Sequence, residues 1–275
     1  MSDIFSGLDK LGLNTNKYKL FEEEKNKQSS KVETITKKSV KDVLYDRKVM
    51  CPVCGEHIIT KTVRSGKVKL ISIDTDLRPK YDILTPYIYD VILCNKCGYA
   101  ALNRFFRKIT DTQASWIKKQ ISASYKGRKY PDEYTYSHAI ERYKLALLNA
   151  VIKRVKASEK AYICLKIAWL YRTHTEYLLK ENNSNQDIIK SNKESEIAFI
   201  EKAYKGFIVA YEAETFPVCG MEEITVMYLI GDLARRLGRN DEAMQWVSRV
   251  IVSKAANERL KERARHVKDL IKGKT

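Results

Sequence analysis

The sequence has no long apolar run. No stretch approaches the roughly 18 uncharged apolar residues that a membrane-spanning helix needs, so we expect no membrane association. The N-terminal residues MSDIFSGLDKLGL lack the basic region and the long apolar region of a secretory signal. We therefore expect a cytoplasmic protein, in which cysteine thiols stay reduced.

Concentrated charge of one sign is also missing. The net charge is +17, yet no block of five or more like charges occurs. Basic residues exceed acidic ones by 3 in residues 1–50, by 7 in residues 51–135 and by 7 in residues 136–275. Such diffuse charge permits weak, non-specific attraction to nucleic acid but does not indicate a dedicated site for it.

No catalytic motif stands out either. The chain has no Gly-rich phosphate loop, no Ser-His-Asp order and no His-Glu-x-x-His pattern, and we expect no enzymatic activity. One polar cluster, in IDTDLRPKYD, could form a small site, although the sequence favours a salt-bridged strand end there. Its members are Asp74, Asp76, Arg78, Lys80 and Tyr81. A site near Asp74 and Arg78 is the remaining enzymatic alternative.

The chain does have two Cys-x-x-Cys pairs, in CPVCG at 51–55 and in CNKCG at 94–98. A redox pair would need a helix N-terminus in a βαβ unit, whereas both pairs lie in β-rich surroundings. Two such pairs together are typical of a tetrahedral four-thiolate metal site. Gly55 and Gly98 permit the left-handed backbone that lets N–H groups point at the sulfurs. The ligands are therefore expected to be Cys51, Cys54, Cys94 and Cys97.

Four thiolates leave no open coordination position, so the site is predicted to be structural. We expect one zinc ion per chain, with iron as the alternative because rubredoxin-type sites use similar pairs. The other metal-binding side chains are read as bystanders. His57 is a strand residue, Cys164 belongs to a helical core face, and Cys219 in FPVCGME lacks a second cysteine because Phe216 stands in that place. His138, His174 and His266 have no partner at ligand spacing.

The chain divides into three parts with an α+β class overall. Residues 1–42 are predicted to be a flexible segment with a short docking stripe of Ile4, Phe5, Leu8, Leu11 and Leu13. Residues 43–110 are predicted to form a small zinc-ribbon-like β module. Strands at 57–64 and 67–76 flank Ser65-Gly66, which predicts a tight hairpin, and residues 86–93 form a third strand.

Residues 111–275 are predicted to be an all-α, tetratricopeptide-like domain. A first helix covers 111–126, and breaks are expected at 181–186 and at Pro217. Tetratricopeptide units place small and large apolar residues at spacings of four and three. Matching positions are Ala139, Tyr143 and Ala146, then Ala203, Phe207 and Ala210, and finally Gly231, Ala243, Val247 and Val250. An irregular helical bundle is the alternative.

Several segments in this order resemble the bacterial family called domain of unknown function 2225. They are IFSGLDKLGL, CPVCG, KVKLISIDTDLRPKYD, YDVILCNKCGYAALNRFF, AIERYKLALLNA, KASEKAYICLKIAWLYR and YLIGDLARRLG. The resemblance spans nearly the whole chain. It implies a cytoplasmic bacterial protein with a zinc-ribbon-like module, in which Cys51, Cys54, Cys94 and Cys97 match the family's cysteines, followed by tetratricopeptide-like helices. It supplies no activity.

The sequence therefore predicts a non-enzymatic zinc-binding adaptor whose helical repeats bind a protein or peptide partner. A groove lined by the helices at 161–175 and 225–238 suits an acidic peptide, because arginine forms fork-like hydrogen bonds with carboxylates. The expected partner-binding residues are Lys166, Arg172, Arg235 and Arg236. The alternative is a nucleic-acid-associated zinc protein with non-specific electrostatic binding.

Overall fold

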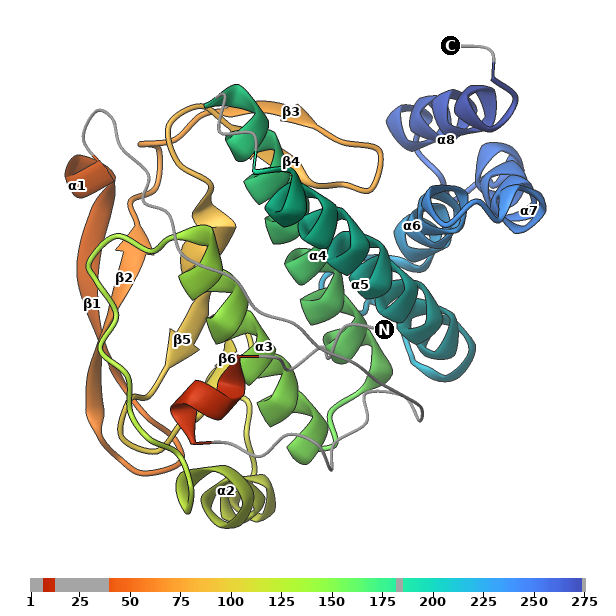
Figure 1. Cartoon of the computed structure of the whole chain (residues 1–275). Helices are drawn as coiled ribbons and strands as arrows, with labels where there is room; N and C mark the ends of the chain where they lie inside the picture. Colours follow the sequence, from red (N-terminus) through yellow and green to blue (C-terminus); the bar gives the residue numbers. More distant parts are fainter. Residues whose placement is uncertain (1–6, 13–39, 182–184, 274–275) are drawn as a thin grey trace.

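A computed structural model describes residues 7–12, 40–181 and 185–273. Three antiparallel strand pairs come first and a succession of helices follows, so the predicted α+β class is confirmed (Figure 1). The strands are β1 (Leu44–Met50), β2 (His57–Val63), β3 (Leu70–Ile73), β4 (Pro79–Tyr81), β5 (Val91–Leu93) and β6 (Ala100–Leu102). No helix in this part of the chain is long and apolar enough to cross a membrane.

Each strand pair is a hairpin between neighbours in the chain: β1 with β2, β3 with β4, and β5 with β6. The hairpin predicted at Ser65-Gly66 is wrong, because β2 pairs with β1 rather than with β3. The β1–β2 ladder has seven residue pairs and sets Val49 opposite Ile58, both of them buried. Because β2 already pairs with β1 along its whole length, Ser65-Gly66 is a turn that connects β2 to β3 without making them a hairpin.

The strand predicted at 86–93 is shorter than expected. Residues Pro86–Tyr89 form the 3₁₀ turn η2, and only Val91–Leu93 are extended. Pro86 stands in the first turn of η2, where its fixed φ suits a helical start and its missing N–H costs nothing. The apolar run therefore bends before it enters the second cysteine pair.

The helices lie one beside the next in chain order, from the strands at one side of the molecule to α8 at the other (Figure 1). Helix α3 packs on β5 and β6 and also on α4, so most of its circumference is buried. The helices are α1 (Val40–Val43), α2 (Asp111–Ile117), the π turn η3 (Lys118–Ser122), α3 (Tyr136–Ile152), α4 (Ala157–Lys180), α5 (Gln186–Ala213), α6 (Glu223–Arg236), α7 (Asn240–Val252) and α8 (Glu258–Ile271).

The predicted first helix and both predicted breaks are confirmed. α2 and η3 cover most of 111–126, with Ile117 and Ile121 fully buried. α4 ends before the break at 181–186, and the chain between α5 and α6 contains Pro217. At Gly231 a Cβ would lie 2.9 Å from Val247 Cγ1, so α6 and α7 approach closely where small residues were predicted. The assignment of these helices to tetratricopeptide repeats stays a prediction.

Part of the predicted docking stripe lies within the described residues. Leu8–Leu11 form the 3₁₀ turn η1, Leu11 is fully buried, and its carbonyl accepts a hydrogen bond of 2.6 Å from the Lys126 N–H. Leu11 therefore docks on this protein itself. Ile4, Phe5 and Leu13 lie outside the described residues, as does most of the predicted flexible segment.

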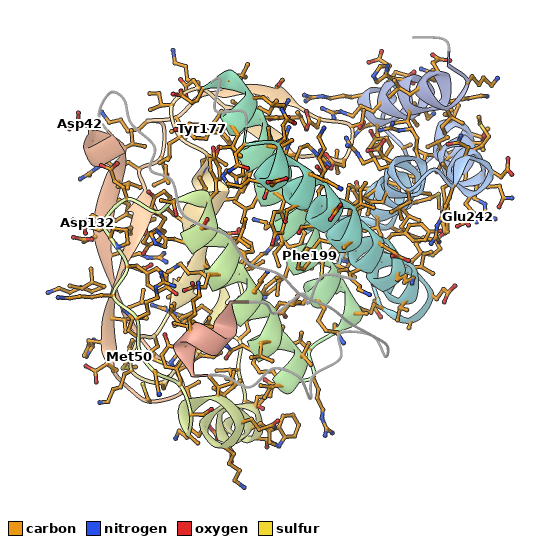
Figure 2. The ribbon with its side chains drawn as sticks, viewed as in Figure 1. Asp42, Met50, Asp132, Tyr177, Phe199 and Glu242 are labelled. Atoms are coloured by element: carbon orange, nitrogen blue, oxygen red, sulfur yellow. The ribbon has the colours of Figure 1, made fainter. Side chains whose placement is uncertain are left out.

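One apolar cluster runs from Leu11 through the strands and α3 to α7, and a second joins α6, α7 and α8. The first cluster crosses the predicted boundary at 110/111, and that division of domains stays a prediction. In Figure 2 the labelled Met50 and Asp132 lie on the β1–β2 side and Glu242 lies on the α7 side. Phe199 of α5 is buried among the helices.

Candidate metal centre and the buried ion network

Both cysteine pairs occupy hairpin turns with the same hydrogen-bond pattern. In the β1–β2 turn, Gly55 N donates to Cys51 O at 2.9 Å. In the β5–β6 turn, Gly98 N donates to Cys94 O at 2.9 Å. Gly55 and Gly98 both have φ of +74°, which confirms the predicted left-handed backbone. Two pairs of ligands are thus presented by two equivalent turns.

The four sulfurs converge. The Sγ atoms of Cys51 and Cys97 are 3.7 Å apart, those of Cys54 and Cys94 are 3.6 Å apart, and all four lie within 4.8 Å of one another. A tetrahedral site with Zn–S bonds of about 2.3 Å requires sulfur separations of about 3.8 Å. The donor set and its spacing therefore fit a four-coordinate metal ion, with all four positions filled by protein.

Backbone N–H groups around the cluster favour the thiolate form of Cys51 and Cys94. The N–H groups of Cys54 and Val53 hydrogen-bond to the Cys51 sulfur, and those of Cys97 and Lys96 do so to the Cys94 sulfur. Hydrogen bonds from Cys51 and Cys97 lower the pKa of the Cys94 thiol. The hydrogen bond to Cys51 instead raises the pKa of Cys97. A cation is needed before all four sulfurs can be thiolates together, so metal binding must release protons.

Neighbouring elements hold the second cysteine turn in place. Ser122 Oγ of η3 donates to Cys97 O at 2.8 Å, and Asn149 Nδ2 of α3 donates to Gly98 O at 3.1 Å. Across the cluster, Lys96 Nζ lies 2.6 Å from Glu56 Oε2, which joins the two turns. The cluster is therefore anchored to the helical half by hydrogen bonds from helix side chains to the backbone carbonyls of the second cysteine turn.

The predicted bystanders are not part of this group of ligands. His57 begins β2 with an exposed side chain, and Cys164 is fully buried in α4. Cys219 lies in the connection between α5 and α6, where its carbonyl accepts a hydrogen bond from Arg104. Among the described residues, only the four predicted cysteines form a group that could hold a metal ion.

The polar cluster at 74–81 is the turn of the β3–β4 hairpin, and its ion pairs confirm the predicted salt-bridged strand end. Arg78 is only 1 % exposed, and every edge of its guanidinium has a partner. Nε donates to Asp74 Oδ2 at 2.7 Å, Nη1 to Thr173 Oγ1 at 2.8 Å, and Nη2 to Glu176 Oε1 at 2.5 Å. Thr173 and Glu176 belong to α4, so Arg78 fixes the hairpin to that helix.

Asp76 is fully buried at the centre of the same network. Its Oδ2 atom accepts from Arg172 Nη2 at 2.7 Å and from Trp169 Nε1 at 3.2 Å, and Arg236 Nε is 3.6 Å away. Burial opposes ionisation, but the charges of Arg172 and Arg236 outweigh it and hold the pKa of Asp76 below its ordinary value. Asp76 is therefore a buried anion that joins the hairpin to α4 and α6.

The four predicted partner-binding residues all pair with acidic groups of the protein itself. Lys166 is buried, with Nζ 2.5 Å from Asp90 Oδ2, and Arg172 also contacts Glu196 Oε1 at 2.6 Å. Arg235 and Arg236 both pair with Asp232, at 2.8 and 2.9 Å. Lys166 lies inside the fold, where Asp90 neutralises it. The partner-binding role of the four stays a prediction.

Sequence reasoning missed the helical half of this network. Glu176, Glu196 and Asp232 lie on three different helices, and even Glu176, which pairs with Arg78 of the hairpin turn, is 98 positions away from it in the sequence. The one available signal was charge inside apolar helix faces, as at Asp232 in LIGDLA and Arg172 in WLYRT. Such a pattern predicts a buried ion but does not name its partner.

The chain matches a known protein family. No curated protein matches it, and no solved structure matches it. The model of a family described as an uncharacterized protein conserved in bacteria (DUF2225) matches residues 44–271. That match includes all four cysteines, the 74–78 hairpin turn and helices α2 to α8. The chain therefore belongs to the bacterial DUF2225 family.

Proposed function

We propose that this protein is a non-enzymatic adaptor in which a structural zinc ion fixes a β module to a helical scaffold for a protein or peptide partner. The observation that carries the proposal is the closed set of four converging cysteines. Because four thiolates fill a tetrahedral site, the metal has no position for a substrate or a reactive water. The reduced thiols that zinc requires are consistent with action in the cytoplasm.

Zinc is proposed over iron, and the two are easily distinguished. Protein purified from bacteria grown with both metals should contain one zinc per chain by elemental analysis and should be colourless. An intense visible thiolate-to-iron absorption band would assign the site to iron instead.

The scaffold role rests on paired helices with exposed apolar side chains. α4 packs along α5, and α6 packs along α7. On α5, Ile197 and Val209 are each 47 % exposed, whereas the apolar stripe of a helix usually faces the core. We propose that the partner contacts this surface of α5, because the arginines of α4 and α6 are occupied by Asp76, Asp232 and Glu196.

A photo-crosslinking residue placed at Ile197 or Val209 tests this surface in the native bacterial host. The matched control is Met50 of β1, which is also apolar and 58 % exposed but lies on the β module. We expect one protein to be captured from both α5 positions and not from Met50, and to bind the purified chain more weakly after Ile197→Glu. Equal capture from all three positions, or unchanged binding by Ile197→Glu, would remove α5 from the proposal.

Nucleic-acid association is the second candidate, favoured by the net charge of +17. A diffuse positive surface should bind random DNA or RNA weakly, without sequence preference, and with affinity that falls steeply as salt rises. Electrophoretic shift or fluorescence anisotropy at several salt concentrations measures this. Sub-micromolar binding to one defined sequence at about 150 mM salt would favour nucleic-acid recognition over the adaptor role.

A further inference from the structure

A pocket of about 660 Å³ lies between the β3–β4 hairpin turn and helices α4, α6 and α8. This volume is within the range of about 300 to 1,000 Å³ that small-molecule sites occupy. Figure 1 shows α8 beside this end of the hairpin, and Arg263 Nη1 reaches to 3.5 Å from Asp74 O. The lining residues are Ile73, Asp74, Thr75, Arg172, Tyr228, Arg236, Arg259, Glu262, Arg263 and His266.

The arginines of this pocket are of two kinds. Arg172 and Arg236 form its inner wall and are already neutralised by Asp76, Glu196 and Asp232. Arg259 and Arg263 come from α8, and no carboxylate among the described residues pairs with either of them. The inner wall is therefore a fixed, charge-balanced surface, whereas the α8 side carries two guanidinium groups available to a ligand.

The two lining arginines of α8 and His266 share one face of that helix. Arg259, Arg263 and His266 follow one another at spacings of four and three, which places them side by side along a helix. Glu262 is the one acidic residue that α8 contributes to the lining, so the α8 side stays positive. Because Arg259 and Arg263 line one pocket, their charges act on the same space.

We propose that this pocket binds a phosphate-bearing small molecule through Arg259 and Arg263. A guanidinium group offers a planar fork of N–H donors that matches two oxygens of a carboxylate or phosphate. A single carboxylate has only the two oxygens that one fork occupies, whereas a phosphate group has a third oxygen for the second fork. The hollow is much larger than one phosphate group, so it also has room for an organic part such as a nucleoside or a sugar.

Binding at this position would also act on the fold. The pocket borders Asp74 and Thr75 of the hairpin turn, and Thr75 Oγ1 accepts a hydrogen bond of 2.8 Å from Arg236 Nη2. A ligand held by α8 against this turn therefore bridges the C-terminal helix to the hairpin. The pocket shares no residue with the cysteine cluster, and ligand binding there does not depend on the adaptor role.

Calorimetric titration of the full zinc-loaded chain with pyrophosphate, inorganic phosphate and ATP at about 150 mM salt tests the site, because that salt suppresses long-range attraction to surface charge. We expect saturable binding of one ATP or pyrophosphate per chain. Tighter binding of ATP would show that the organic part occupies the hollow, and equal binding of inorganic phosphate would identify the free anion as the ligand.

The variants Arg259→Gln and Arg263→Gln should each weaken binding about tenfold or more, as expected when a charged hydrogen-bond partner is lost. Arg265→Gln is the matched control, because Arg265 lies on the same helix, pairs with Glu258 at 2.6 Å and is not part of the lining. Absence of saturable binding of all three probes up to millimolar concentration would overturn the proposal. An equal loss in the Arg265→Gln control would overturn it too, since the attraction would then be only to net charge.

Discussion

At the scale of single residues, the two cysteine turns share a backbone but not an environment. Gly55 and Gly98 have the same φ, so a side chain at either position would be strained. A Cβ on Gly55 would meet no atom within 4 Å. A Cβ on Gly98 would lie 2.6 Å from Tyr125 Cγ and 2.8 Å from Ile121 Cγ2. The second turn is thus tightly covered by Ile121 and Tyr125, whereas the first has open space beside its glycine.

This difference predicts unequal costs for the same substitution. Gly55→Ala should lower the free energy of unfolding by about 1 to 2 kcal/mol, the usual cost of a left-handed backbone for a residue with a Cβ. Gly98→Ala should cost clearly more, because Ile121 and Tyr125 must move as well. Urea denaturation of both zinc-loaded variants measures the difference. Equal losses would mean that the α2–η3 segment yields to the added methyl group without cost.

The cysteines make a second prediction at this scale. Cys94→Ser removes one of four converging ligands, so the variant should be purified with little metal and should lose stability in the β hairpins. Cys219→Ser is the control, because Cys219 lies outside the cluster, and it should keep a full equivalent of metal. Elemental analysis of the two purified variants decides the matter. Metal loss in Cys219→Ser would show that this residue contributes to the site.

At the scale of elements, the β3–β4 hairpin is attached to the rest of the molecule by ion pairs. β3 and β4 form only a short, irregular ladder, and their exposed or half-buried side chains contribute little to the apolar core. Asp74, Asp76 and Arg78 in the turn connect them to α4 and α6 instead. Removing one partner of a buried ion pair leaves the other charge unpaired, which costs more than the pair itself is worth.

We therefore expect Asp76→Asn to destabilise the protein by about 3 to 5 kcal/mol at pH 7, the usual cost of breaking a buried pair. The exposed Asp269→Asn on α8 is the control and should change stability by less than about 0.5 kcal/mol. Chemical denaturation of both variants measures the effect. A small loss in Asp76→Asn would mean that Trp169 and neighbouring groups reorganise around the neutral amide.

The pH dependence should follow the same residues. Burial opposes ionisation of Asp74 and Asp76, yet the charges of Arg78 and Arg172 respectively prevail, and both pKa values lie below those of free carboxyls. Stability from such groups is present above the unfolded-state pKa of about 4 and is lost as the pH falls through the lower folded-state pKa. The stability difference between wild type and Asp76→Asn should therefore shrink below about pH 4. A difference that is constant down to pH 3 would contradict the ionised state of Asp76.

The elements also show what the sequence could and could not predict. The cysteine cluster could be predicted because each half of it is local: two cysteines and a glycine within five positions fix one turn. The pairing of β2 with β1 was missed because the cysteine turn itself is the hairpin loop, and the Ser65-Gly66 turn signal is equally compatible with a connection. The pairing of Asp76 with Arg172, 96 positions away, depends on helix packing that no local pattern encodes.

At the scale of the whole molecule, stability should be unevenly distributed. The strand pairs are isolated two-stranded hairpins, and such hairpins are marginal in water without a further partner. The cysteine cluster joins β1–β2 to β5–β6, and Ser122 and Asn149 attach the second of these hairpins to η3 and α3. At the other end of the molecule, α6, α7 and α8 are held together by a second apolar cluster, and Leu77 packs at its margin. The two ends are thus stabilised by different means.

Removal of the metal should reveal this division. After treatment with a strong chelator, amide hydrogen exchange should accelerate most in β1–β2 and β5–β6, because four sulfurs without a cation no longer hold the two turns together. Exchange in η3 and in the part of α3 near Asn149 should rise less, since the apolar contacts of α3 with α4 remain. Helices α6 to α8 should keep their protection, because residues of all three also form a second apolar cluster that contains none of the cysteines. Loss of protection in α6 to α8 at the same rate would instead show that the single cluster running from the strands to α7 makes the whole chain one cooperative unit.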